Sequence, residues 1–315
     1  MSPTISIVIP AYNAAQTILQ TLNSVLQQTF KDFEVIVIND GSTDKTLELL
    51  QTIQDPRLQI FNYENGGLPV ARNRGISHAQ GEFIAFLDAD DWWSSDKLES
   101  QWAALQEHPE AGVAYSWNYY QYDNSEQSYA ETSNTFQGNV YADLLVKNFI
   151  QNGSNPLIRK AAIASVGLFD SSLKSCEDWE YYLRLAKHWP FVLVPKVQVF
   201  YRKSSTSMTS KIEVMETYLR LVIDRAFQSA PPELQHLKSQ SLSWVTQYIA
   251  EHYLKSKQAT LQQLSIVGAN LCKTIWLHPP HLLEPYAQCL IRMFLKQLFL
   301  QVFKKRKSPP APVIN

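Results

Sequence analysis

Residues 5–87 alternate short apolar runs with segments of helical spacing, and this alternation restricts the fold more than any other feature of the chain. The apolar runs cover residues 5–9, 33–39, 58–63 and 83–87. Strands that alternate with helices of about 10–15 residues predict βαβ units and a parallel sheet. Right-handed crossovers bring the carboxyl ends of such strands to one edge, where open α/β sheets bind their ligands.

Three of these four runs end in a polar cluster. The clusters are Pro10-Ala-Tyr-Asn, Asp40-Gly-Ser-Thr-Asp and Asp88-Ala-Asp-Asp. A single ending of this kind is explained by a turn and a helix cap. Three at the same edge of a sheet indicate a binding site.

The third cluster carries carboxylates two residues apart. On an extended chain, Asp88 and Asp90 would face the same side while Ala89 points away. Mg²⁺ and Mn²⁺ prefer oxygen ligands and commonly bind through one or two carboxylates together with substrate phosphates. An isolated Asp-x-Asp is more often a loop of helix-capping acids, so the metal interpretation depends on the other motifs.

Composition narrows the class of protein. The chain of 315 residues has room for about two domains, and its formal net charge of -1 argues against a nucleic-acid partner, which normally needs a basic domain. Cys176, Cys272 and Cys289 form no C-x-x-C pair, so neither a zinc site nor a disulfide framework is expected. No signal-peptide pattern and no apolar run of about 18 residues is present. We therefore expect a cytoplasmic protein.

The remainder of the chain divides into an irregular middle and a helical end. The middle predicts a strand over 112–122, a helix over 141–149, a short edge strand over 155–159 and extended chain over 191–201. Helical patterns follow over 212–228, 233–256, 260–276 and 281–303, with breaks at Pro231-Pro232 and Pro279-Pro280. These patterns predict an α/β domain over residues 1–210, a helical region over 211–303 and a basic, Pro-rich, disordered tail over 304–315.

Six short motifs follow one another in the order of a known family. They are Pro10-Ala-Tyr-Asn, Asp40-Gly-Ser-x-Asp, Asn65-Gly-Gly with Ala71-Arg-Asn-x-Gly, Leu87-Asp-x-Asp-Asp, Gly167-x-Phe-Asp and Glu177-Asp-Trp-Glu. Each motif is weak alone, but together they resemble the family 2 glycosyltransferases over about residues 4–209. The chain departs from that pattern after Tyr201-Arg202, where Ser204 stands at the position of a His in many relatives.

The resemblance implies a GT-A fold, which is a Rossmann-like, mostly parallel sheet flanked by helices, here with an α-helical C-terminal extension. It also implies a metal-dependent, inverting glycosyltransferase of the hexosyltransferase type. Such an enzyme moves a sugar from a nucleoside-diphosphate sugar to the hydroxyl group of a glycan or lipid-linked acceptor. The expected role is the synthesis of cell-surface polysaccharide or glycolipid.

The same resemblance assigns residues to roles, motif by motif. It assigns donor binding to Pro10, Tyr12, Asp40, Arg72 and Asp88, with Tyr12, Asp40 and Arg72 at the base and Asp88 at the ribose. Asp90 would bind Mn²⁺ or Mg²⁺, and Asp178 would be the general base that takes the acceptor proton, a role that gives about 100- to 10,000-fold in rate. Asn155, Glu177 and Trp179 would lie on the acceptor side.

Asp178 also has a structural interpretation. Ser175-x-x-Asp178 has the spacing of a capping box at the start of a helix. The spacing alone favours a role of Asp178 in capping the helix. When the upstream motifs are taken into account as well, the catalytic role is favoured. The two roles are compatible.

Three other classes of protein fit part of the pattern. A nicotinamide-dependent oxidoreductase should carry Gly-x-Gly-x-x-Gly after its first strand, whereas this chain has Pro10-Ala-Tyr-Asn there. A sugar-phosphate nucleotidyltransferase would need a basic, Gly-rich triphosphate loop near the first strand, and a non-enzymatic carbohydrate-binding protein would not explain carboxylates at strand ends. The glycosyltransferase remains the favoured function.

Residues 281–303 have the composition of a helix at a membrane interface. Leucines and aromatic residues form a wide apolar stripe, and the basic residues after Pro285 are not accompanied by any Asp or Glu. Such a helix lies on an anionic membrane surface, which would place the protein peripherally on the inner face of the plasma membrane. Packing on the preceding helices, or a homodimer contact, explains the stripe equally well.

Overall fold

The structure is a computed structural model of the chain, and it describes residues 2–122, 128–203, 212–255 and 259–306. Ser204 and residues 307–315 of the predicted tail lie outside these ranges. The chain forms two compact units, one made of Met1–Leu144 with Asn148–Lys211 and one made of Leu145–Lys147 with Ile212–Asn315. Within the described residues, no helix is both long enough and apolar enough to cross a membrane.

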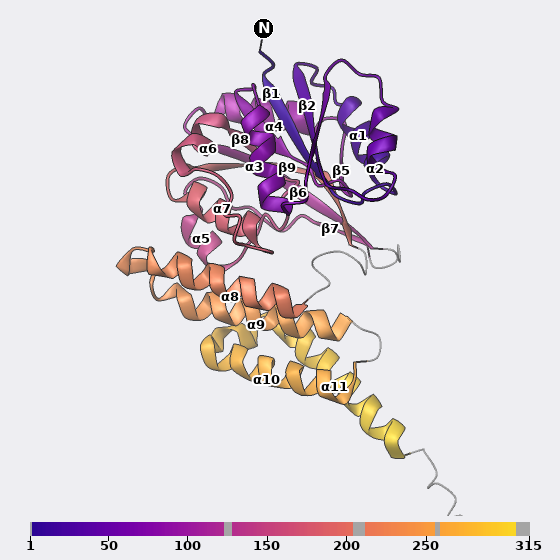
Figure 1. Cartoon of the computed structure of the whole chain (residues 1–315). Coiled ribbons are helices and arrows are strands. Elements are labelled where there is room, and N and C mark those ends of the chain that lie inside the picture. Colours follow the sequence, from indigo (N-terminus) through magenta and orange to yellow (C-terminus); the bar gives the residue numbers. More distant parts are fainter. Residues whose placement is uncertain (1, 123–127, 204–211, 256–258, 307–315) are drawn as a thin grey trace, which may run out of the picture. The chain divides into compact units, whose positions relative to one another are not determined.

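A single sheet organises the first unit (Figure 1). Its strands are β1 (Ile5–Ala11), β2 (Phe33–Asp40), β3 (Leu58–Tyr63), β4 (Phe83–Phe86), β5 (Trp92–Trp93), β6 (Val113–Tyr122), β7 (Tyr129–Glu131), β8 (Leu157–Arg159) and β9 (Phe191–Lys203). They lie in the order β3-β2-β1-β4-β8-β6-β9-β5, and β7 pairs with β6. The predicted α/β fold, with parallel strands at its centre, is confirmed.

Strand direction determines where the site can form. β1 to β4 are parallel to their neighbours, while β8 is antiparallel to both β4 and β6, so β6 and β9 run in the same direction as β4. Six strands therefore end at one edge of the sheet. The prediction of an edge strand over 155–159 is wrong, because β8 lies in the middle of the sheet with Leu157 and Ile158 fully buried. β8 has only three residues, Leu157–Arg159, and it pairs with β4 on one side and with β6 on the other.

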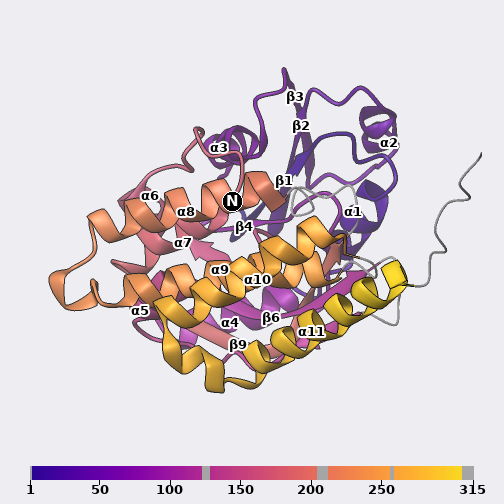
Figure 2. The ribbon, with the colours of Figure 1, turned by 90° about the horizontal axis from the view of Figure 1, so that it is seen from below.

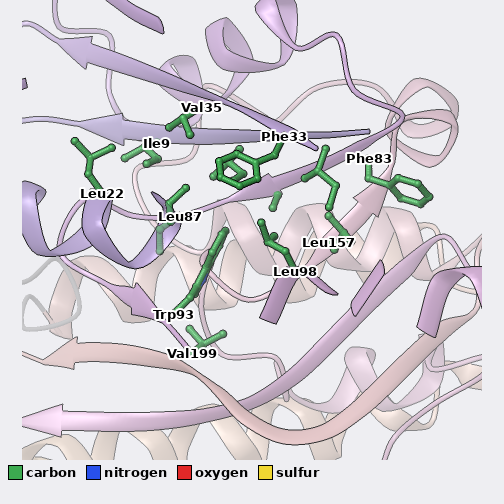
Figure 3. Close-up of a cluster of buried hydrophobic side chains, with 14 of the residues drawn as sticks. Ile9, Leu22, Phe33, Val35, Phe83, Leu87, Trp93, Leu98, Leu157 and Val199 are labelled. Atoms are coloured by element: carbon green, nitrogen blue, oxygen red, sulfur yellow. The ribbon is translucent and has the colours of Figure 1, made fainter. Parts of the chain in front are cut away.

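Seven helices accompany the sheet. They are α1 (Ile18–Leu26), α2 (Thr46–Gln51), α3 (Leu68–His78), α4 (Lys97–Glu107), α5 (Tyr141–Val146), α6 (Lys160–Val166) and α7 (Glu177–Ala186). Successive side chains of β1 point to opposite faces of the sheet. Ile9 of β1 shares one core with Leu22 of α1 and Leu98 of α4 (Figure 3), so α1 and α4 cover the same face. On the other face α3 comes very close, because a Cβ atom at Gly75 would lie 2.1 Å from Val8 Cγ1.

The second unit is helical. It contains α8 (Ile212–Gln228), α9 (Leu237–Lys255), α10 (Leu261–Leu277) and α11 (Pro285–Arg306), with short 3₁₀ turns η3 (Pro232–Leu234) and η4 (Pro279–Leu283). Figure 2 shows α9, α10 and α11 side by side, and their shared core includes Leu254, Leu264 and Leu290. Each Pro-Pro pair lies at a 3₁₀ turn between helices, as expected. Because α11 continues to Arg306, the first residues of the predicted tail are helical rather than disordered.

Candidate active site

The ends of β1 and β2 are joined by a network of side-chain hydrogen bonds. Asn13 has a left-handed backbone with φ of 49°, and its Oδ1 accepts a hydrogen bond from the Thr43 backbone N–H at 2.8 Å. Its own N–H donates to Ser42 Oγ at 3.0 Å. Tyr12 is thereby left pointing outward with 54% of its surface exposed, whereas Pro10 is buried within β1. Tyr12 can therefore offer a ring face to a base, and Pro10 can contribute only as part of the strand.

Asp40, at the end of β2, organises the loop that precedes α3. Its carboxylate accepts backbone hydrogen bonds from Gly66 at 3.0 Å and Gly67 at 2.8 Å. Arg74 Nη1 donates to the same carboxylate at 2.7 Å, and Asp40 is 3% exposed. A carboxylate has about four acceptor sites, so one remains for a ligand N–H group. The arginine that contacts Asp40 is Arg74, which was not among the predicted site residues.

The Asp88-Ala-Asp-Asp segment is a turn and not the extended chain that we predicted. β4 ends at Phe86, and the Asp91 N–H donates to the Asp88 carbonyl at 3.0 Å, which closes a turn through Ala89 and Asp90. Ala89 is buried in the core, while Asp88 and Asp90 are partly exposed. Burial together with the nearby Asp88 charge raises the pKa of Asp90 to about 6. Two carboxylates are therefore held near each other at the carboxyl end of β4.

Asp91 was not predicted as a site residue, yet it connects three parts of the site. It is fully buried, and its carboxylate accepts hydrogen bonds from Ser154 Oγ at 2.5 Å and from the Arg202 backbone N–H at 2.9 Å. Ser154 Oγ in turn accepts the Asp88 N–H at 3.0 Å. The sequence showed Asp91 only as the third acid of the motif. Its burial could not be predicted, because its partners Ser154 and Arg202 lie far away in the chain.

Arg72, on α3, is buried between two acids. Its Nη2 donates to Asp88 Oδ1 at 2.7 Å and its Nη1 donates to Glu177 Oε1 at 2.7 Å, with the arginine side chain only 1% exposed. These two ion pairs join the end of β4 to the start of α7. Gly153 makes room for the guanidinium, since a Cβ atom there would lie 2.1 Å from Arg72 Nη2. Arg72 therefore sets the spacing between Asp88 and the helix that carries Asp178.

Asp178 lies in the first turn of α7 and is partly exposed. Burial of its carboxyl and the neighbouring Glu177 charge raise the pKa of Asp178 to about 7, although Arg72 opposes this rise. The capping box that we considered does not form: the N-cap residue is Cys176, in a left-handed conformation with φ of 61°, and Asp178 Oδ1 accepts only from the adjacent Trp179 N–H at 2.7 Å. A carboxyl that titrates near neutral pH can act as a general base.

The three residues predicted on the acceptor side are buried and already have protein partners. Asn155 is 0% exposed and bonds through both polar atoms of its side chain to the backbone of Ser116 on β6. Trp179 is 1% exposed and donates from Nε1 to the Leu144 carbonyl, and Glu177 is bound to Arg72. In this structure they support the site from within, and their assignment to the acceptor side stays a prediction.

The acids at the end of β4 could bind a divalent cation whose coordination is completed by the phosphates of the substrate. In the described part of the chain, no three His, Cys, Asp or Glu residues cluster closely enough to hold an ion by themselves. Both Asp88 and Asp90 are partly exposed, but Asp88 is already bound to Arg72, so Asp90 is the carboxylate more available to a cation. Mg²⁺ commonly binds in this manner, through one or two carboxylates with substrate phosphates and water. The donor set is consistent with Mg²⁺ or Mn²⁺.

Sequence comparison gives relatives of one kind. A putative teichuronic acid biosynthesis glycosyltransferase of Bacillus subtilis, TuaG, is 41% identical over 121 residues, which are 38% of this chain and 47% of that protein. An uncharacterized glycosyltransferase of Rickettsia typhi is 28% identical over 269 residues, which cover 82% of this chain and 84% of the relative. A further one, from Rickettsia bellii, is 37% identical over 177 residues, 55% of this chain, but the chain spans only 25% of its length.

Solved structures with the same fold are also glycosyltransferases. Residues 1–349 of Staphylococcus aureus TarS, also crystallised with UDP-GlcNAc, superpose with a TM-score of 0.62 at 19% identity, over 99% of this chain and 93% of that chain. The mannosyltransferase PcManGT of Pyrobaculum calidifontis, in complex with GDP-Man and Mn²⁺, gives 0.59 at 17% identity, over 96% of this chain and 88% of that chain. At these identities the likeness shows the fold alone, which is of the GT-A type. The family described as glycosyltransferase like family 2 matches residues 6–255, and this chain belongs to it.

Proposed function

We propose that the protein is an inverting glycosyltransferase that takes its sugar from a nucleoside-diphosphate sugar. The observation that carries the proposal is the chain of contacts from Asp88 through Arg72 to Glu177, because it holds Asp178 at a fixed place relative to Asp88 and Asp90. Donor-binding and proton-accepting groups at one sheet edge are what a single displacement at an anomeric carbon requires. UDP-GlcNAc and GDP-Man in the structural neighbours support a nucleotide-sugar donor.

Each residue would have a separate task in this reaction. Tyr12 stacks on the base, and the remaining acceptor site of Asp40 takes a base N–H group. Asp88 accepts a ribose hydroxyl. Asp90 would hold Mg²⁺ or Mn²⁺, which when bound neutralises charge on the leaving nucleoside diphosphate. Arg72 remains between Asp88 and Glu177, and it keeps the donor-binding residues at a constant distance from the general base, Asp178.

Asp178 would act on the acceptor. As the acceptor oxygen forms a bond to the anomeric carbon, the bond from that carbon to the diphosphate oxygen breaks, and its electron pair leaves with the nucleoside diphosphate. The acceptor hydroxyl proton passes to the Asp178 carboxylate. Attack from the face opposite the leaving group inverts the anomeric centre. A pKa of about 7 keeps part of this carboxyl in the basic form at neutral pH.

One relative supports a biological setting for the reaction. TuaG is described as a putative teichuronic acid biosynthesis glycosyltransferase, and this supports an acceptor among cell-surface polysaccharides or their lipid-linked precursors. Within the described residues, the exposed Cys272 and Cys289 form no disulfide, which suits a reducing compartment. We therefore place the reaction on the cytoplasmic side of the cell envelope.

A donor screen tests the proposal. The full chain is incubated with UDP-GlcNAc, GDP-Man and other nucleotide sugars, with Mn²⁺ or Mg²⁺, with and without glycan and lipid-linked acceptors. Release of nucleoside diphosphate is measured, and the product's anomeric configuration is determined by NMR. An inverted product supports the proposal. Retention of configuration contradicts the single displacement, and release of pyrophosphate from a sugar phosphate and a nucleoside triphosphate would show a nucleotidyltransferase instead.

A further inference from the structure

The outer face of α11 carries apolar and basic side chains together. Arg292, Leu295, Lys296 and Phe299 are spaced three and four residues apart, so they lie on one face of the helix. Leu295 is 56% exposed and Phe299 is 59% exposed, and both basic residues are exposed as well. Contiguous apolar patches on a protein surface commonly mark sites of protein or membrane contact.

The opposite face of α11 is already occupied by its own unit. Leu290 is buried in the core shared with α9 and α10, and Phe294 packs against it. Gln297 Nε2 donates to the Leu254 carbonyl at 2.8 Å, and Gln301 Nε2 donates to the Ala259 carbonyl at 2.8 Å. These contacts fix the rotation of the helix about its axis, so the outer face cannot turn inward without breaking them.

The charge of α11 selects among partners. Between Pro285 and Arg306 the sequence has five basic residues and no acidic one, the basic ones being Arg292, Lys296, Lys304, Lys305 and Arg306. A two-fold dimer along this face would bring basic side chains of two copies together without an acid on either helix to pair with them. An anionic surface meets the same face with opposite charge.

We propose that the outer face of α11 docks on an anionic lipid surface. Leu295 and Phe299 enter the boundary between headgroups and acyl chains, and Arg292 and Lys296 extend to the lipid phosphates, as amphipathic side chains do at such interfaces. The proposal concerns attachment and does not depend on the sugar-transfer reaction. The sequence predicted that the whole apolar stripe of residues 281–303 could contact a membrane. Half of that stripe is buried inside the unit, so only the outer face is proposed to bind lipid.

Other exposed residues of this unit agree with an interface. Trp276 is 81% exposed, Leu283 is 77% exposed and Tyr286 is 42% exposed. Trp and Tyr are enriched at the headgroup level because their rings are apolar and carry one polar group. The negative charge of the cytoplasmic leaflet attracts each nearby Lys or Arg, so the inner face of the plasma membrane is the surface that we assign.

The test uses the full-length chain and vesicles. Co-sedimentation is measured with phosphatidylcholine vesicles and with vesicles that also contain phosphatidylglycerol, at low and at high salt. We expect binding to the anionic vesicles that weakens with salt. Arg292→Gln together with Lys296→Gln should reduce the partition coefficient about 30-fold, as follows from the attraction per basic residue. Leu295→Ser together with Phe299→Ser should reduce it by about tenfold or more.

Matched controls separate docking from general effects of charge and polarity. Lys45→Gln removes an exposed cation, and Leu168→Ser removes an exposed leucine, both in the other unit; neither should change vesicle binding by more than about twofold. Circular dichroism checks that each variant is folded, and since all substituted side chains are exposed we expect native spectra. No binding by the wild-type chain, or equal binding by wild type and both double variants, overturns the proposal. A dimer in light scattering that the Leu295→Ser/Phe299→Ser variant abolishes, without vesicle binding, overturns it in favour of self-association.

Discussion

Buried charges distinguish the sheet unit from the helical unit. In the sheet unit, the end of β4 is joined to α7 by Arg72, which is 1% exposed and bound to two carboxylates. In the described part of the helical unit, the ion pairs that lysine and arginine form are exposed or partly exposed, such as Arg220 with Glu216, each 36% exposed. The helical unit instead leaves large apolar side chains exposed, with Trp276 and Leu283 as the most open.

The difference indicates what each unit is built to hold. Buried ion pairs rarely add net stability, because each charge loses its hydration, but they fix geometry when every partner is present. In the sheet unit, the buried ion pairs of Arg72 lie where the sugar-donor site and the general base Asp178 are proposed to keep a constant distance. The helical unit has an apolar core shared by α9, α10 and α11, and its exposed apolar side chains are the basis of the proposed lipid contact.

The largest expected effect comes from removing the buried cation. Arg72→Met leaves the buried Glu177 and the partly exposed Asp88 without this positive partner, so we expect a loss of about 3–5 kcal/mol in the free energy of unfolding. Arg220→Met, which breaks an exposed pair four residues apart on α8, is the matched control and should cost less than about 1 kcal/mol. Urea unfolding followed by circular dichroism measures both. Similar losses for the two variants would contradict the contrast between the units.

The second effect separates catalysis from stability at Asp178. Asp178→Asn should lower turnover by about 100-fold or more, because the general base is lost, with donor binding near wild type. The pKa of Asp178 is about 7 in the folded protein and 3.8 as its ordinary value. The folded state therefore binds this proton more tightly, and the carboxyl lowers stability progressively as pH rises from about 4 to 7. The Asn variant should melt at a higher temperature than wild type at pH 8, and this advantage should disappear near pH 4.

Two further measurements accompany this variant. In the wild-type enzyme, kcat/KM should rise as pH increases through about 7, since the base must lose its proton before it can accept another. Glu180→Gln is the control, because Glu180 lies in the same helical turn and pairs with Arg184; it should keep turnover within a few-fold. If Asp178→Asn melts earlier at pH 8 and its folded fraction retains full turnover, Asp178 serves only to start α7.

The third effect concerns the metal. Asp90→Asn replaces the partly exposed carboxylate of the turn, so we expect donor affinity in the presence of Mn²⁺ to fall by about tenfold or more. Thermal stability should stay the same or rise, since burial and the charge of Asp88 already raise the pKa of Asp90 to about 6. Calorimetric titration of a nucleotide sugar, with metal and with excess chelator, measures the effect. Wild-type affinity and turnover in excess chelator would exclude the metal role.

The sequence was sufficient to predict the parallel strands of the sheet and the edge at which polar side chains gather. The alternation of strands and helices predicts a parallel sheet, and the clusters at Asp40 and Asp88 predict the edge where polar groups gather. Both inferences depend only on local patterns. The family match over residues 6–255 confirms the resemblance drawn from the order of the motifs.

Partner choice within the site could not be predicted, because it depends on packing. Arg72 and Arg74 lie two residues apart on α3, so they point in different directions, and only the fold shows that Arg72 meets Asp88 while Arg74 meets Asp40. Asp91 looks like its neighbour Asp90 in sequence, but it is buried against Ser154 and the backbone of Arg202. Asn155 is likewise fully buried, and its side chain bonds to the backbone of Ser116 on β6.

The smallest expected effect compares one glycine from each unit. Gly41 has φ of +74°, and a Cβ atom there would lie 2.8 Å from the backbone nitrogen of Asn65. Gly41→Ala therefore combines an unfavourable backbone conformation with a clash against a rigid atom, and it should cost about 1–3 kcal/mol in unfolding free energy. Because Asn65 precedes the glycines that bind Asp40, donor affinity should fall as well.

Gly268 in α10 provides the contrast. A Cβ atom there would lie 3.2 Å from the Phe294 ring, a contact that requires only a small movement of a side chain. Ala is favoured over Gly in a helix by about 1 kcal/mol, so the tight contact and the gain in propensity nearly cancel. Gly268→Ala should change the unfolding free energy by less than about 1 kcal/mol, in either direction. A loss at Gly268 as large as that at Gly41 would show that the helical unit is as tightly constrained as the site, and that its contrast with the sheet unit does not hold.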